Sequence, residues 1–226
     1  MATGFLEWFS GTKKEESGFG IAPGTVTDNF NVLSEGRVQV HIPAFPDFDP
    51  WARVVGIGGG PGRGFLWVPQ INDEVLIALN QNDHRDAYVI GGLWSALNRP
   101  PLINPIDFLT KRILQTGLAD SPVGHTVEFD DALQSVKITT STSQQITLDP
   151  TQIQISTSGG LLSVTLDIAD APPTIQIQAT AGDITLSAPA GTITLDALNV
   201  EIQSDVSTDI SSDGTVSVEG TLITLN

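Results

Sequence analysis

The chain has 226 residues, of which 40% are hydrophobic, and a formal net charge of −16 at pH 7. Nucleic acid and anionic membrane surfaces would repel so acidic a protein, which argues against both as electrostatic partners. The chain has no cysteine, which excludes a disulfide framework, a thiol nucleophile and zinc sites of the cysteine type.

The first 19 residues are expected to form a tail. An apolar cluster lies near its start and consists of Phe5, Leu6, Trp8 and Phe9. Such a cluster at a terminus either docks on a partner or covers the chain's own fold, and we favour docking. Residues 1–20 lack the basic start and long apolar core of a signal peptide, and no run approaches the ~20 apolar residues of a membrane span. The sequence therefore predicts synthesis in the cytoplasm without a signal peptide.

Residues 20–101 have the pattern of a small β domain. Candidate strands span residues 24–30, 36–42, 51–57, 64–68, 74–80 and 87–93. Turn-rich segments separate them, among them the glycine-rich run 58–64. Five or six short strands without room for crossover helices predict a closed barrel of the OB type.

Residues 102–120 are expected to link two domains. Asn104-Pro105 is typical of a helix start. Ile106, Leu109, Ile113 and Leu114 would share one helical face, with Gly117 as a stop. We expect a short helix near residues 105–110.

Residues 121–226 alternate apolar and polar side chains from Val136 onward, which is the period of half-buried strands. Ala181-Gly-Asp-Ile-Thr-Leu and Ala190-Gly-Thr-Ile-Thr-Leu repeat at a spacing of nine. The expected strands centre on residues 146–148, 153–155, 162–168, 175–177, 184–186, 193–195, 200–202, 216–218 and 222–225.

The composition of this region indicates how it packs. There is no aromatic residue after Phe129 and no lysine or arginine after Lys137, so the core must be narrow and aliphatic. Units of about nine residues are too short for the coils of a single-chain solenoid, which need about 20 residues or more. The sequence therefore predicts parallel copies wound into an intertwined rod, most simply a trimer, with a single-chain β-solenoid as the alternative.

No motif predicts catalysis, a cofactor site or a metal site. The glycine run 58–64 lacks the Lys-Ser/Thr of a phosphate loop, and the three histidines lack metal-ligand spacing. Paired carboxylates lie at expected turns or strand edges, where capping and solvated roles dominate over the flanking geometry of a glycosidase. These pairs are Asp47/Asp49, Asp73/Glu74, Asp83/Asp86 and Asp130/Asp131.

An ordered series of motifs resembles the OB domain of contractile-tail central spikes, found in phage baseplates and type VI secretion systems. The series runs Gly24-Thr-Val-Thr-Asp-Asn, Gly36-Arg-Val-Gln-Val, Trp51-Ala-Arg-Val, Gly64-Phe-Leu-Trp-Val-Pro, Asp73-Glu-Val-Leu-Ile-Ala-Leu and Asp83-His-Arg-Asp-Ala-Tyr-Val-Ile-Gly-Gly-Leu-Trp. The block Gly124-His-Thr-Val-Glu-Phe-Asp-Asp is similar to the entry into that family's β-helical needle. The resemblance covers residues 20–226 and implies an all-β homotrimer, an OB barrel followed by an intertwined triple-stranded β-helix. It also implies that residues 111–116 are extended.

For function, the resemblance implies a non-enzymatic central spike resident in the baseplate of a virion or injection particle. Its trimeric needle would puncture the target envelope, contacting the membrane only transiently. The tail cluster would dock on a separate hub protein. The absence of histidine after His125 makes a built-in metal tip unexpected, and a PAAR-type tip protein would contact the end of the needle. The residues expected at this contact are Thr221, Leu222, Ile223, Thr224, Leu225 and Asn226.

A different class of function stays open at this point, a trimeric fibre with a carbohydrate-binding OB module. Such modules stack sugars on exposed aromatic rings, and Trp51, Trp67 and Trp94 could supply them. These residues lie within apolar segments, which favours core packing instead.

Overall fold

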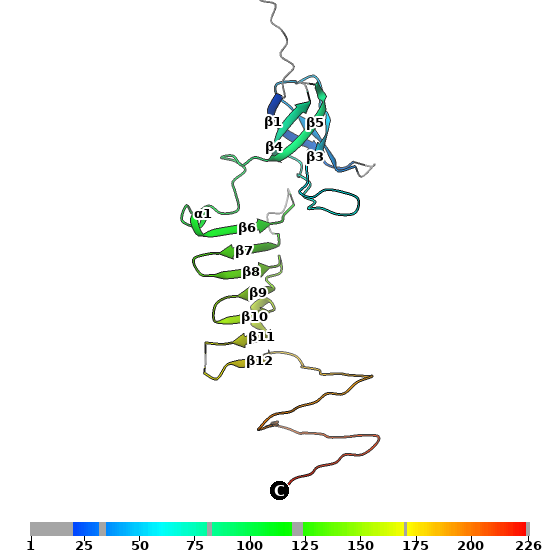
Figure 1. The fold of residues 1–226 in the computed structure, drawn as a ribbon, viewed down its shortest axis with the longest axis vertical. Coiled ribbons are helices and arrows are strands. Elements are labelled where there is room, and N and C mark those ends of the chain that lie inside the picture. Colours follow the sequence, from blue (N-terminus) through cyan, green and yellow to red (C-terminus); the bar gives the residue numbers. More distant parts are fainter. Residues whose placement is uncertain (1–19, 32–34, 81–82, 119–123, 170, 225–226) are drawn as a thin grey trace, which may run out of the picture. The chain divides into compact units, whose positions relative to one another are not determined.

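The computed structural model describes residues 20–31, 35–80, 83–118, 124–169 and 171–224. The chain divides into two units, residues 1–182 and residues 183–226. The strands of the described residues form one closed barrel and one seven-stranded sheet, both in the first unit (Figure 1). The all-β prediction is confirmed for these parts.

The barrel has five strands, as the sequence predicts for an OB-type domain. They are β1 (Gly20–Asp28), β2 (Arg37–His41), β3 (Trp51–Val54), β4 (Glu74–Asn80) and β5 (Asp83–Gly92). Their order around the barrel is β1-β2-β3-β5-β4, and β1 pairs with β4 to close it. All pairings are antiparallel except that of β3 with β5.

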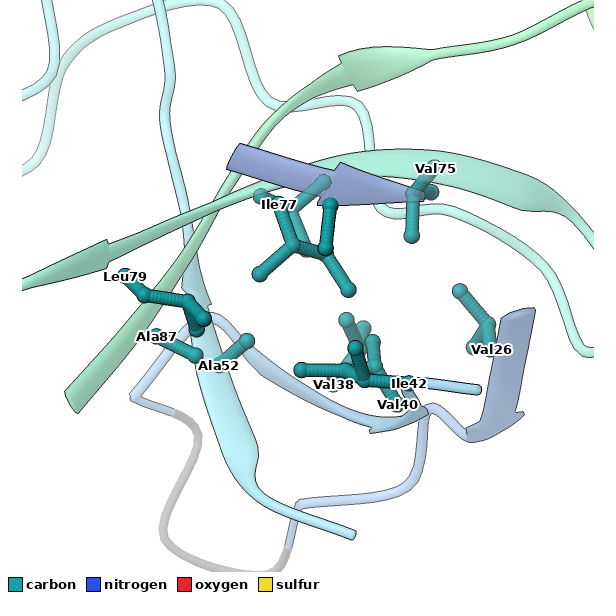
Figure 2. Close-up of a cluster of buried hydrophobic side chains, with 11 residues drawn as sticks. Val26, Val38, Val40, Ile42, Ala52, Val75, Ile77, Leu79 and Ala87 are labelled. Atoms are coloured by element: carbon teal, nitrogen blue, oxygen red, sulfur yellow. The ribbon is translucent and has the colours of Figure 1, made fainter. Parts of the chain in front are cut away.

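Small aliphatic side chains fill the barrel (Figure 2). Alternate residues of β4 are buried, namely Val75, Ile77 and Leu79, because every second side chain of a strand points inward. The other buried apolar residues are Ala22, Val26, Val38, Val40, Ile42, Ala52, Ala87 and Val89. At Gly24 the backbone of β1 passes so close to β2 that a Cβ atom would lie 2.8 Å from the carbonyl oxygen of His41.

The expected strand at residues 64–68 is wrong. Five strands already close the barrel, so this segment has no ladder to join and lies in the long connection between β3 and β4. Its main-chain tie to that connection is the amide of Phe65, which donates to the carbonyl of Ile57 at 2.9 Å.

The segment expected to be a linker contains a helix and a strand. Helix α1 (Asp107–Thr110) confirms a short helix near residues 105–110. The extension of one helical face to Ile113 and Leu114 is wrong, because strand β6 (Lys111–Gln115) follows directly. The extended conformation that the resemblance implies for this segment is confirmed.

Strand β6 is the first strand of the seven-stranded sheet, which is an antiparallel meander in which each strand pairs with the next along the chain. The remaining strands are β7 (Thr126–Asp130), β8 (Ser135–Thr139), β9 (Gln145–Leu148), β10 (Gln152–Ser156), β11 (Leu162–Asp167) and β12 (Thr174–Ala179). A 3₁₀ turn, η1 (Ser158–Gly160), joins β10 to β11. The inner strands are thus hydrogen-bonded on both edges within one chain. In the intertwined rod that the sequence predicts, strands would instead pair with strands of other chains.

In the second unit, the described residues 183–224 form no strand. They run as extended segments separated by turns (Figure 1). The strands expected near residues 184–186, 193–195, 200–202, 216–218 and 222–225 are therefore not formed within the described part of a single chain.

Candidate assembly site

The register of the seven-stranded sheet collects apolar side chains on one of its faces. Residues directly opposite each other on neighbouring antiparallel strands lie on the same face. Val127 is opposite Ile138, which is opposite Ile146, which in turn is opposite Ile155. We call this surface the apolar face, and its side chains form two columns that run across the strands. The first column consists of Phe129, Val136, Leu148, Ile153, Leu166 and Ile175. The second consists of Leu114, Val127, Ile138, Ile146, Ile155, Val164 and Ile177.

The opposite face of the same sheet is polar, with Ile113 as its apolar exception. One of its rows runs through Glu128, Lys137, Thr147, Gln154, Thr165 and Gln176. The two faces differ because the side-chain period of a strand is two, so the alternation in the sequence sorts apolar from polar side chains.

Large parts of the apolar face are uncovered in the single chain. Ile153 is 42% exposed, Ile155 is 50% exposed and Ile177 is 56% exposed. A sheet with one apolar face needs a second layer to bury it. Contiguous exposed apolar surfaces of this kind are typical of protein interaction sites. The arrangement is therefore suited to binding another apolar surface.

An ion-pair cluster ties α1 to the first two strands of the sheet. The ammonium of Lys111 lies 3.2 Å from Glu128, 3.8 Å from Asp130 and 4.0 Å from Asp107. The hydrogen bond to Glu128, with the charge of that carboxylate, raises the pKa of Lys111. The cluster holds the start of β6 against β7.

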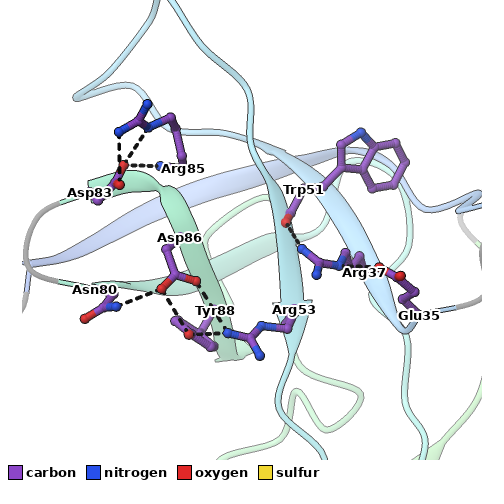
Figure 3. Close-up of polar contacts among 9 residues, drawn as sticks. All are labelled: Glu35, Arg37, Trp51, Arg53, Asn80, Asp83, Arg85, Asp86 and Tyr88. Carbon is purple, nitrogen blue, oxygen red and sulfur yellow. Dashed lines mark hydrogen bonds and ion pairs between the residues drawn. The ribbon is translucent and has the colours of Figure 1, made fainter.

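A polar cluster on the barrel links three strands (Figure 3). Asn80 and Tyr88 donate hydrogen bonds to Asp86 at 2.8 and 3.2 Å, and these bonds lower the pKa of that carboxyl. The guanidinium of Arg53 lies over the ring of Tyr88 at 4.5 Å and 3.4 Å from Asp86. This cluster could not be predicted from the sequence, since only the parallel pairing of β3 with β5 brings Arg53 to Tyr88.

Two of the tryptophans expected in the core are exposed. Trp67 is 44% exposed and stacks on Phe65, itself 47% exposed, with ring centroids 5.8 Å apart. Trp94 is 72% exposed, and Trp51 is half-buried. The core-packing interpretation is wrong for Trp67 and Trp94, because the barrel interior is already filled by smaller side chains.

The paired carboxylates occupy structural positions. Asp49 lies 2.9 Å from Nδ1 of His41, and Asp73 accepts the amide of Gln70 at 2.8 Å. Asp83 pairs with Arg85 at 3.0 Å. Asp130 is buried and accepts the amides of Ala132 and Leu133 in the turn after β7. These contacts are those of turns and strand edges.

The remaining predicted site residues lie at the two ends of the chain. Phe5, Leu6, Trp8 and Phe9 lie outside the described residues, as do Leu225 and Asn226. Residues 221–224 are exposed and belong to no strand. Within the described ranges, no three potential ligands among histidines and carboxylates gather into a metal site. Nor does a helix of these ranges have the length and apolarity to cross a membrane.

Comparison with known proteins identifies the barrel. Residues 22–94 match the family described as the type VI secretion system/phage-baseplate injector OB domain. Over 102 residues, the chain is 28% identical to the Actin cross-linking toxin VgrG1 of Vibrio cholerae serotype O1. That alignment covers 42% of this chain and only 9% of the toxin.

The family match spans nearly the whole five-stranded barrel, from β1 to just beyond β5. The matched residues thus coincide with the closed barrel. The barrel of this chain is therefore similar to the OB domain of type VI secretion and phage-baseplate injectors.

Proposed function

We propose that this protein is the structural, non-enzymatic central spike of a contractile injection apparatus, and that three copies join through their apolar faces into a needle. The observation that carries the proposal is the exposure of that face in the single chain, where Ile155 remains 50% uncovered. An identical face on another copy is largely aliphatic and of equal length, which makes it a complementary cover.

The second unit supports assembly in a different way. Residues 183–224 continue the alternation of apolar and polar side chains, and their backbone joins no strand ladder in the described chain. Extended backbone that is to be buried needs hydrogen-bond partners. Strands from the other two copies supply these partners in an intertwined needle, the triple-stranded β-helix that the sequence resemblance implies.

The remaining parts of the proposed spike rest on the sequence resemblance. The barrel trimer sits on a separate hub protein, to which the cluster of Phe5, Leu6, Trp8 and Phe9 docks. The end of the needle, residues 221–226, carries a PAAR-type tip protein. Sheath contraction drives the needle through the target envelope, which it contacts only transiently. The protein resides in the baseplate.

Light scattering on the full chain and on residues 1–110 tests the assembly. The boundary is placed before β6, so that the whole sheet is removed. We expect a full-length mass of three times the 23.9 kDa of the chain and a monomeric barrel fragment. Circular dichroism checks that the fragment is folded. A monomeric full-length protein would exclude the needle, and a dimer would point to two sheets packed face to face.

A second candidate function is a carbohydrate-binding barrel on a trimeric fibre. The exposed stack of Phe65 on Trp67 favours it, because sugars bind to exposed aromatic rings. A glycan array separates the two functions, since the spike is expected to bind no glycan. Binding that is lost in Trp67→Ala would support the fibre.

A further inference from the structure

We propose that Arg112 and its two counterparts in the trimer bind an inorganic oxyanion at the first layer of the needle. The inference rests on the proposed threefold assembly and adds a ligand site to it. It begins with one residue that does not fit the apolar face.

Arg112 lies at the head of an apolar column. In the register of β6 and β7 it is opposite Phe129, and Phe129 is opposite Val136. Its side chain therefore belongs to the apolar face, beside Leu114. Among the ladder positions of β6–β12 that make up this face, Arg112 is the one charged residue.

The guanidinium of Arg112 has no carboxylate partner among the described residues. Its Nη1 donates to the carbonyls of Lys111 at 2.6 Å and Phe108 at 3.4 Å. The N–H groups of Nε and Nη2 have no acceptor within the described part of the chain. The carboxylates of this region, Glu128, Asp130 and Asp107, gather around Lys111.

Assembly changes the surroundings of this cation. When three apolar faces meet around one axis, the three Arg112 side chains enter the same layer, bounded below by the rings of Phe129. Like charges repel one another more strongly as water is excluded, and an unpaired charge in such a place is costly. A polyvalent oxyanion on the axis neutralises the three cations and accepts the hydrogen bonds of Nε and Nη2. Arginine suits this task because its planar fork matches the oxygens of phosphate or sulfate.

The test uses the full-length protein in a chloride buffer, with inorganic phosphate and sulfate as probes. Titration calorimetry is expected to find one anion per three chains, and the melting temperature of the trimer should rise with the concentration of phosphate. In Arg112→Gln, phosphate should bind roughly tenfold or more weakly, since charge-assisted hydrogen bonds are lost. Arg112→Lys keeps the charge and should retain part of the binding. The matched control is Arg85→Gln, which removes an exposed arginine that pairs with Asp83.

Four results would overturn the proposed anion site. A monomer in light scattering removes the trimer, and the proposed site falls with it. A stable trimer that binds no phosphate, or binds it equally in Arg112→Gln, overturns this inference and leaves the spike intact. Equal loss in Arg112→Gln and Arg85→Gln indicates general attraction to surface cations, which also overturns it. If Arg112→Gln lowers the melting temperature by the same amount with and without phosphate, the guanidinium stabilises the protein only through its hydrogen bonds to the carbonyls of Phe108 and Lys111. This result would also overturn the inference.

Discussion

The substitution Ile155→Thr tests the proposed needle at the centre of the apolar face. Ile155 lies on β10 between Ile146 of β9 and Val164 of β11. Threonine keeps the β-branched shape that favours a strand but places a hydroxyl on the apolar face. Gln154→Thr is the matched control, because it creates the same residue at the neighbouring position on the polar face.

The size of the effect follows from the exposure of the side chain. Ile155 is 50% exposed in the single chain, so assembly buries about half of it. Complete burial of an isoleucine stabilises by about 1.5–3 kcal/mol, which makes the half covered in assembly worth about 1 kcal/mol per copy. A buried hydroxyl without a partner costs a further ~1–3 kcal/mol. The two costs sum to at least about 2 kcal/mol per copy, so the trimer of three copies loses about 6 kcal/mol or more, and its dissociation constant rises about 10,000-fold or more.

The assay is chemical denaturation at several protein concentrations, with light scattering to follow dissociation. Ile155→Thr is expected to lower the denaturant midpoint and to show monomer at concentrations where the natural protein is trimeric. Gln154→Thr should leave the denaturant midpoint and the dissociation of the trimer unchanged. Equal effects of the two substitutions would refute the burial of this face by other copies.

Two further predictions concern the barrel. Gly24→Ala should destabilise it by roughly 1–3 kcal/mol in thermal unfolding followed by tryptophan fluorescence, because the new Cβ atom meets the His41 carbonyl at 2.8 Å. Gly91→Ala, whose Cβ has nothing within 4 Å, is the control, and an equal loss there would contradict the packing argument. The second prediction is a pH dependence. Hydrogen bonds from Asn80 and Tyr88 hold the pKa of Asp86 below its ordinary 3.8, so its stabilising contribution is complete above that value and is lost as the pH falls through the lowered pKa. Asp86→Asn should therefore flatten the acid limb of the stability curve below pH 4, measured by melting temperature, whereas the same change at exposed Asp47 should not.

Local patterns predicted much of the fold correctly. The alternation in residues 136–179 identifies β8 to β12, and the spacing of turns in residues 20–93 identifies the five barrel strands. In the segment after Asn104, the local pattern predicted the wrong secondary structure. Ile113 and Leu114 suit one face of a helix, yet the pairing of β6 with β7 makes them a strand, because the ladder satisfies more backbone groups than one added helical turn.

The candidate site was only partly predictable. The apolar side chains of the sheet could be found from their period, but their columns depend on the register, which a single sequence does not specify. Lys111 and Arg112 are neighbours that differ in surroundings. Lys111 meets three carboxylates, one from α1 and two from the polar face of the sheet. Arg112 lies on the apolar face and has no carboxylate partner among the described residues.

The sequence by itself determined which side chains share a face, since the period of two is a local property of extended backbone. It also determined the aliphatic character of β8 to β12, as no aromatic residue follows Phe129. Only the tertiary structure decided which strands meet. It places β3 parallel to β5, leaves residues 64–68 outside the ladder and brings Arg53 to Tyr88. These outcomes depend on hydrogen bonds between residues far apart in the chain, which local propensity does not encode.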